Sequence, residues 1–338
     1  MLRRRTLLGA AAGGLAGAMA PRFAQAQQAD RTFRIYRITY RGRTEVEDGF
    51  DDYLASNGIP VEFIERDAER GVALLPQFKQ EIRELKPDLV YTWGTPVTLG
   101  IAGKYDAADP GEFIRDIPVV FALVSSPVAA GLVTDNARPG RNVTGAVHVV
   151  PTETQLRAMH SYRPIERLGV LYTSTEPNSV SIVEELRALQ GPLGFSLVER
   201  RFNLDAAGKP TADGIEQLIA EIGAERANWL YLLPDTFLGT QYDRVVPAAL
   251  NERLPTFGAA ELAIRQGGAL VGLISRYYSV GQLAASKAVR ILRDGVPVED
   301  VPIETLKRFS LIINLPVAKK LDLYPPIEML NYAEVLTG

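Results

Sequence analysis

Short apolar runs alternate along the chain with segments whose apolar positions recur at helical spacing. In the first third of the chain, the apolar runs predict strands and the amphipathic segments predict helices. Asn57-Gly58 is expected to end the first helix, and Pro87-Asp88 is expected to form a turn before the third strand. The predicted strands span 33–40, 61–64, 89–92 and 119–124, and the predicted helices span 45–56 and 75–85. This alternation is typical of parallel βαβ units.

The same alternation restarts after residue 165. Strands are predicted over 168–172, 196–201 and 229–233, with helices over 180–189 and 214–222. A weak internal repeat accompanies the restart, because 88–95 resembles 228–236 and 117–121 resembles 254–257. We therefore predict an α/β protein with two doubly wound, parallel-sheet lobes.

The first 26 residues have the pattern of an export signal. Arg3, Arg4 and Arg5 precede an apolar run over 7–20, and Ala24-Gln25-Ala26 places small residues where a signal peptidase cleaves. A membrane helix needs roughly 20 apolar residues, which this run does not reach. Arg4-Arg5 followed by Thr6-Leu7-Leu8 also fits a twin-arginine leader, although the general export route stays open. We expect residues 1–26 to be a cleaved signal peptide and the protein to be periplasmic.

Composition narrows the possible partners and chemistry. The chain carries 37 basic and 40 acidic residues, and a net charge of −3 does not favour nucleic acid as a partner. The chain has no cysteine, which excludes disulfides, thiolate metal sites, a cysteine nucleophile and a lipid anchor on a cysteine after the leader. We expect a freely soluble periplasmic protein.

The motifs of common enzymes are missing from the sequence. The two histidines, His148 and His160, do not have metal-ligand spacing, and the sequence lacks a P-loop, a nucleophile elbow and a zinc-protease motif. A catalytic pair of carboxylates is still compatible with 40 acidic residues. We expect no metal, no cofactor and no catalysis, and keep a two-domain α/β enzyme as the rival class.

Polar residues follow predicted strands of the first half, at the sheet edge where open parallel sheets bind ligands. Thr95 comes after the third strand, and a helix beginning at Pro96 would make Thr95 its N-cap. Ser125 and Ser126 follow the fourth strand in the same way. Such helix starts suit a carboxylate or another anion, but each is also compatible with a cap that binds nothing.

The second half offers a facing set of polar residues. The loop over 173–179 and the side chains of Asp235 and Glu261 each follow a predicted strand, and their carboxylates could hold a ligand amine. Arg276 and Tyr277 follow the strand at Val271. The arginine could bind a carboxylate, and the tyrosine could stack on an aromatic ring. Solvated carboxylates and half-buried core tyrosines are the alternative interpretation.

The order of these motifs resembles one family, the periplasmic substrate-binding proteins of ABC transporters, whose few assigned members bind aromatic amino acids. The resemblance covers nearly the whole chain after the leader and is strongest toward the C-terminus. It rests on Gly94-Thr95-Pro96, 117–122 with 125–128 and 131–133, Asn142-Val143-Thr144-Gly145, Glu176-Pro177-Asn178-Ser179, 277–281, 284–295 and 309–315.

The resemblance implies a type I periplasmic-binding-protein fold, in which three crossovers join two lobes around a ligand cleft. The crossovers would lie near His148, Leu273 and Thr305. An N-terminal lobe would then comprise 30–148 and 274–304, and a C-terminal lobe 149–273 and 305–338. Ligand contacts carried over from the family are Thr95, Ser125, Ser126, Asn178, Ser179, Asp235 and Glu261.

Two departures from the family pattern bear on the ligand. Ser126 stands where the family commonly has Asp, and Arg276 stands where the family has Asp before the paired aromatics. Each change removes a carboxylate that could neutralise a ligand ammonium. An anionic or uncharged ligand, such as an aromatic or short organic acid, fits these changes, whereas Asp235 and Glu261 fit an amino acid.

These inferences predict a solute receptor that closes its lobes on a small molecule and presents it to an ABC permease in the inner membrane. We expect it to act as a monomer. A periplasmic sensor that hands the closed form to a signalling receptor would use the same cleft and is the alternative.

Overall fold

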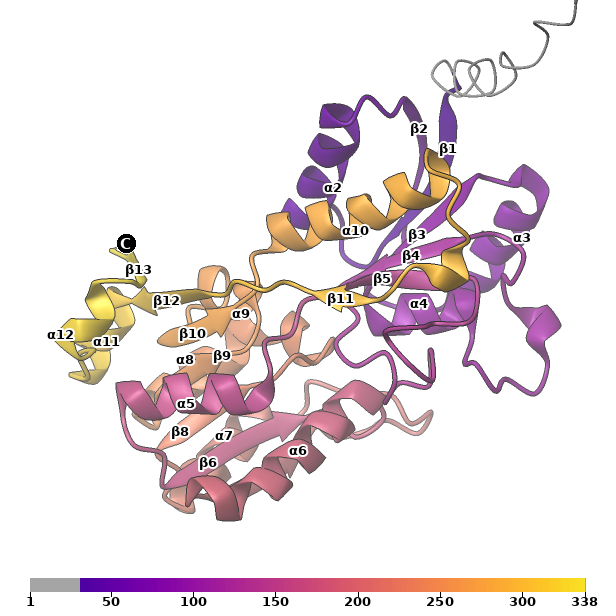
Figure 1. The fold of residues 1–338 in the computed structure, drawn as a ribbon. Coiled ribbons are helices and arrows are strands. Elements are labelled where there is room, and N and C mark those ends of the chain that lie inside the picture. Colours follow the sequence, from indigo (N-terminus) through magenta and orange to yellow (C-terminus); the bar gives the residue numbers. More distant parts are fainter. Residues whose placement is uncertain (1–30, 338) are drawn as a thin grey trace, which may run out of the picture.

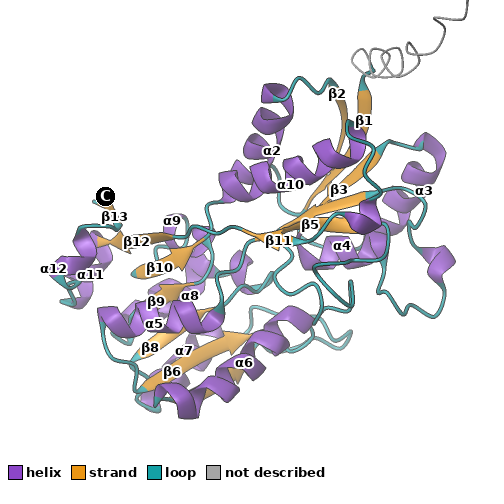
Figure 2. Cartoon of the chain, viewed as in Figure 1, coloured by secondary structure: helices purple, strands orange, loops and turns teal. Residues whose placement is uncertain are grey.

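The computed structural model describes residues 31–337, which form two lobes, each built on its own β-sheet (Figure 1). The predicted signal peptide over 1–26 lies outside the described residues. Helices flank both sheets, as expected for parallel strands that must be buried on both faces (Figure 2).

The N-terminal lobe contains a six-stranded sheet in the order β11-β5-β4-β3-β1-β2, with every neighbouring pair parallel. Its strands are β1 (Phe33–Thr39), β2 (Val61–Asp67), β3 (Leu89–Trp93), β4 (Val119–Ala122), β5 (Val143–Val147) and β11 (Glu304–Thr305). Its helices are α2 (Glu45–Ser56), α3 (Leu75–Leu85), α4 (Gly94–Ala102) and α10 (Tyr277–Leu292).

The C-terminal lobe contains a seven-stranded sheet in the order β13-β12-β10-β9-β8-β6-β7. Its strands are β6 (Arg167–Tyr172), β7 (Ser196–Arg201), β8 (Trp229–Leu232), β9 (Thr256–Gly258), β10 (Val271–Ile274), β12 (Ser310–Asn314) and β13 (Glu334–Leu336). Its helices are α5 (Thr152–Tyr162), α6 (Pro177–Leu193), α7 (Ile215–Ala224), α8 (Tyr242–Asn251), α9 (Glu261–Arg265), α11 (Leu315–Leu321) and α12 (Ile327–Leu330).

The chain crosses between the lobes three times. It leaves the first sheet after β5, returns to the N-terminal lobe between β10 and α10, and leaves again between β11 and β12. The predicted fold, two doubly wound lobes joined by three crossovers, is confirmed. One detail differs from the prediction of purely parallel sheets, because β12 runs antiparallel to β10.

Helix α10 is held in the N-terminal lobe by a close crossing with α2 (Figure 1). A Cβ atom at Gly281 would lie 1.9 Å from the carbonyl oxygen of Val46, and one at Gly49 would lie 2.0 Å from that of Tyr278. Both distances are far shorter than any van der Waals contact, so the two helices can cross this closely only where both residues lack a side chain.

Most predicted elements agree with the structure within a few residues, and two differences concern the predicted site. Helix α4 begins at Gly94 with Trp93 in the cap position, so the prediction that Thr95 is an N-cap is wrong. Strand β4 ends at Ala122 because Leu123 has a φ of 61°, a left-handed conformation that is rare for a bulky residue and often marks functional sites.

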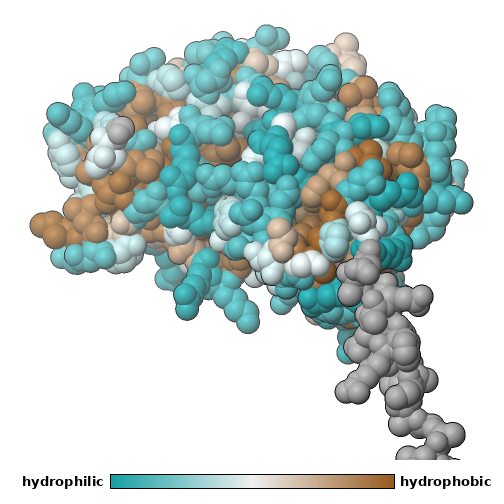
Figure 3. Space-filling model, turned by 90° about the horizontal axis from the view of Figure 1, so that it is seen from above, coloured by the Kyte–Doolittle hydropathy of each residue, from teal (hydrophilic) through white to brown (hydrophobic). Residues whose placement is uncertain are grey.

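The face of the molecule shown in Figure 3 is mostly hydrophilic, with apolar patches at both ends of the view. One group of exposed apolar side chains lies in the C-terminal segment around α12 and comprises Tyr324, Ile327, Leu330 and Tyr332. Within residues 31–337, no helix combines the length and hydrophobicity that crossing a bilayer requires.

Candidate functional site

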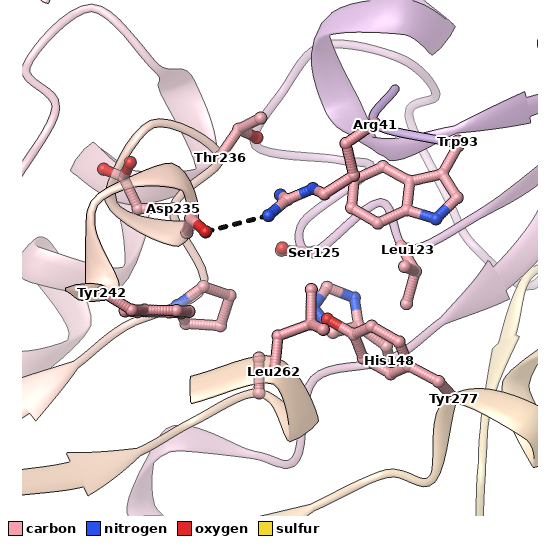
Figure 4. Close-up of a pocket in the computed structure, with 13 residues that line it drawn as sticks. Arg41, Trp93, Leu123, Ser125, His148, Asp235, Thr236, Tyr242, Leu262 and Tyr277 are labelled. Carbon is pink, nitrogen blue, oxygen red and sulfur yellow. Dashed lines mark hydrogen bonds between the residues drawn. The ribbon is translucent and has the colours of Figure 1, made fainter. Parts of the chain in front are cut away.

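A small cavity lies between the two lobes, at the carboxyl ends of strands from both sheets (Figure 4). Its volume of about 30 Å³ is enough for roughly two water molecules. The N-terminal lobe contributes Arg41, Trp93, Leu123, Ser125, His148 and Tyr277, and the C-terminal lobe contributes Pro234, Asp235, Thr236, Gly239, Tyr242, Ala260 and Leu262. Open α/β sheets bind ligands at this edge.

Arg41 reaches across the cavity from the loop after β1. Its Nη1 donates a hydrogen bond to the carbonyl oxygen of Gly239 at 2.9 Å, which connects residues 198 positions apart in the two lobes (Figure 4). The guanidinium carbon lies 4.9 Å from the ring centroid of Trp93 and 5.6 Å from that of Tyr40. These two rings stack at 5.9 Å with an interplanar angle of 11°, so the cation rests against an aromatic wall.

Among residues 31–337, three side chains that line the cavity from the N-terminal lobe have a buried nitrogen atom without a hydrogen-bond partner. These atoms are Nε of Arg41, Nε1 of Trp93 and Nδ1 of His148. Buried polar groups are nearly always hydrogen-bonded, so each unpaired group needs an explanation. Burial lowers the pKa of His148 to about 3, so its imidazole is neutral at physiological pH. The N-terminal wall therefore offers hydrogen-bonding groups that a ligand could satisfy.

The carboxylates on the C-terminal side are satisfied within the protein. Asp235 accepts hydrogen bonds from the backbone nitrogens of Thr173, at 2.7 Å, and Leu238, at 2.8 Å, and from the Thr173 hydroxyl. Behind it, Glu176 accepts from the backbone nitrogen and the hydroxyl of Thr236, at 2.9 and 2.6 Å. These bonds hold the loop after β8 against the loop after β6.

Burial raises the pKa of both carboxyl groups. The pKa of Glu176 rises to about 8 through burial and the nearby charge of Asp235. Burial also raises the pKa of Asp235, against the effect of its backbone hydrogen bonds to Leu238 and Thr173. The pair therefore retains protons at higher pH than free carboxyl groups do.

Three of the residues selected from the sequence line the cavity, namely Ser125, Asp235 and Tyr277. Ser126 instead lines a neighbouring hollow of about 160 Å³ beside the first crossover. Thr95 is buried in the first turn of α4. The structure thus brings together part of the predicted set.

Asn178 and Ser179 are buried in the first turn of α6, outside the cavity lining. Asn178 donates through Nδ2 to the carbonyl oxygen of Pro234 at 3.0 Å. Because Pro234 lines the cavity, Asn178 supports the wall from behind.

Glu261 and Arg276 belong to an ionic cluster at the second crossover and do not line the cavity. Glu261 accepts the backbone N–H of Tyr277 at 2.6 Å, capping the start of α10, and accepts Nε of Arg265 at 2.7 Å. The Arg276 guanidinium pairs with Glu334 on β13 and donates to Ser310 Oγ at 3.1 Å. Arg41 lines the cavity, whereas the sequence pattern predicts Arg276.

Several lining residues were not selected from the sequence, including Arg41, Trp93, His148 and Tyr242. His148 directly follows β5, Arg41 lies two residues past the end of β1, and Trp93 ends β3. The rule that selected Ser125, a polar residue just past a strand, would have found Arg41 and His148. Within residues 31–337, no group of histidine and acidic side chains could hold a metal ion.

Comparison with known proteins gives a consistent assignment of family and fold. The family model described as "ABC transporter substrate binding protein" matches residues 36–336. A tyrosine-binding protein of Clostridioides difficile strain R20291 is 26% identical over 272 residues, which cover 80% of this chain and 73% of the relative.

Solved structures of similar fold cover 90% of the chain. A conserved domain protein of Vibrio cholerae has a TM-score of 0.78 at 25% identity, with 99% of that chain covered. An ABC domain from Streptococcus pneumoniae in complex with L-Trp has a TM-score of 0.78 at 21% identity, with all of that chain covered. A ligand-free, open substrate-binding protein with adhesive properties from Clostridium difficile has a TM-score of 0.68 at 24% identity, with 99% covered.

Proposed function

The chain belongs to the family of ABC transporter substrate-binding proteins, and we propose that it is the solute-binding component of an ABC-type uptake system. The observation that carries the proposal is the cavity between the lobes, with walls from both sheets and three buried nitrogen atoms that have no partner within residues 31–337. Two-lobed proteins of this kind close around their ligands by hinge motion. The three crossovers provide the hinge.

The ligand is a small organic or aromatic acid, or an amino acid. Trp93, Tyr242 and Tyr277 give the cavity aromatic walls, and Arg41 places a positive charge on its N-terminal side. The relative named as a tyrosine-binding protein supports a ligand of this class. A cavity of about 30 Å³ is too small for any of these molecules, so the lobes must separate before the ligand enters.

The proposed solute-binding role also implies a permease partner and a cellular compartment. A binding component delivers its ligand to an inner-membrane ABC permease, and the export signal predicted over 1–26 would place the protein in the periplasm. In this role the protein acts as a monomer, binds its ligand reversibly and does not convert it.

Mass spectrometry of small molecules released from the natively purified periplasmic protein tests this function. We expect one organic acid or amino acid in near-stoichiometric amount, recovered unchanged after incubation. Leu262→Trp places an indole in the cavity and should abolish retention, whereas Leu204→Trp, at an exposed position, should not. Conversion of the ligand to a product would contradict the proposal in favour of an enzyme.

Uptake by cells that lack their periplasmic contents tests the transport step. Spheroplasts of the source organism should recover ligand uptake when the purified protein is added, but not when Leu262→Trp is added. Ligand binding without restored uptake would contradict a transport role and support a sensor.

A further inference from the structure

The guanidinium of Arg41 has an edge that is free to bind a ligand. Arginine carries five N–H donors, and hydrogen bonding within residues 31–337 gives an acceptor only to Nη1, on Gly239. Nε is buried and has no acceptor, and no hydrogen bond is formed by Nη2 in the same part of the chain. Nε and Nη2 form the edge through which arginine binds a carboxylate with two parallel hydrogen bonds.

Nothing in the described part of the chain neutralises this cation at close range. No carboxylate oxygen of residues 31–337 lies within 4.0 Å of the Arg41 guanidinium, although Arg37, Arg43 and Arg276 all have such partners. Asp235 lines the same cavity, but its oxygens already accept hydrogen bonds from Thr173 and Leu238. A cation placed in an aromatic cleft without a counter-charge favours an anionic ligand group.

The surroundings hold the guanidinium in place for this role. Trp93 and Tyr40 pack against it, and the indole Nε1 of Trp93 is a further donor without an acceptor. On the opposite side, Gly239 leaves room for it, since a Cβ atom there would lie 3.2 Å from both terminal nitrogens of Arg41.

We propose that Arg41 is the specificity-determining residue of the cleft, and that its Nε–Nη2 edge binds a carboxylate group of the ligand. This inference rests on the proposed function. The site therefore selects small carboxylates over amides and amines of the same shape.

Matched acid and amide ligands test this selectivity. The probes are L-tyrosine and L-tyrosinamide, L-tryptophan and L-tryptophanamide, and 3-phenylpropanoate and 3-phenylpropanamide, titrated by calorimetry into the full chain freed of bound ligand. For each acid and amide pair that the wild type binds, we expect the acid to bind at least about tenfold more tightly. The amide loses the charge-assisted hydrogen bond that the carboxylate makes with Arg41.

Variants of Arg41 separate recognition from folding. Arg41→Ala should remove the preference for the acid, and Arg41→Lys should retain part of it, because lysine keeps the charge but not the planar fork. Arg43→Ala is the matched control, since Arg43 lies in the same loop, is half exposed and pairs with Asp48 and Asp51 outside the cavity. Circular dichroism and thermal melting establish that each variant is folded.

The possible failures point to different conclusions. Equal binding of acid and amide by the wild type, or an unchanged preference in Arg41→Ala, would overturn the role of Arg41 and leave the proposed function intact. If no acid or amide binds and no small molecule is recovered from the native protein, the proposed function itself fails, and this inference fails with it.

Discussion

The two walls of the cavity are built on different principles. On the C-terminal side, Asp235 and Glu176 accept hydrogen bonds from the backbone and hydroxyls of their own lobe. On the N-terminal side, Arg41, Trp93 and His148 each keep a buried nitrogen without a partner. The carboxyl groups of the C-terminal wall thus bind their own lobe, whereas these three nitrogens of the N-terminal wall have no partner in the described part of the chain.

The two tryptophans of the chain show the same contrast. Trp229 lies in the core of the C-terminal lobe and donates through Nε1 to the carbonyl oxygen of Arg163 at 3.1 Å. Trp93 lines the cavity, and residues 31–337 provide no acceptor for its Nε1. An unsatisfied buried donor costs about 1–3 kcal/mol, so a ligand that supplies the acceptor recovers part of that free energy.

Substitution of Asp235 should produce the largest difference between the walls. Asp235→Ala leaves the backbone N–H groups of Thr173 and Leu238 without an acceptor, and we expect the free energy of unfolding to fall by about 3 kcal/mol. Arg41→Ala removes one hydrogen bond between the lobes and should cost less than about 1 kcal/mol. Urea denaturation followed by circular dichroism measures both, and equal losses would contradict the contrast.

The pH dependence of stability tests the buried carboxyl pair. The folded-state pKa of Glu176, about 8, exceeds the usual value near 4.5, so between these values the folded protein binds more protons than the unfolded chain. The contribution of Glu176 to stability is complete below pH 4.5 and is lost as the pH rises through 8.

We therefore expect Glu176→Gln to flatten the decline of unfolding free energy between pH 5 and 8. The change in slope should be at most about 1.4 kcal/mol per pH unit, the value for one proton. Glu199→Gln, at a surface ion pair with Arg187, is the control. An identical decline in wild type and Glu176→Gln would show that Glu176 is already ionised in the fold.

The smallest predicted effect concerns the indole nitrogen of Trp93. Trp93→Phe keeps an aromatic ring against Arg41 but removes the donor, so ligand affinity should fall about fivefold, the effect of one ordinary hydrogen bond. Ligand-induced changes in tryptophan fluorescence should also disappear in this variant and persist in Trp229→Phe. A fluorescence response that depends on Trp229 would place the ligand elsewhere.

Local patterns determined the order and type of most elements. Helices α2 and α3 occupy the predicted ranges because their apolar spacing and their end residues act within a few positions of one another. Strand ends could also be located from sequence, and in parallel sheets these ends form the binding edge. Ser125, Asp235 and Tyr277 were found at the cavity for this reason.

Contacts between distant segments could not be predicted in this way. Arg276 looked available for a ligand, yet Glu334, 58 residues later, pairs with it, because β13 joins the edge of the C-terminal sheet beside β12. Glu261 looked suited to an amine, yet the second crossover brings the start of α10 onto its carboxylate. Arg276 and Glu261 thus bind partners that lie 58 and 16 residues away in the sequence.

The sequence by itself determined the alternation of strands and helices, the two-lobed α/β fold and the strand edges where polar residues collect, since these depend on periodicity and short-range signals. The tertiary structure alone decided which cation reaches the cavity. That choice depends on which charges find partners when the lobes fold, and the Nε–Nη2 edge of Arg41 has no partner within residues 31–337.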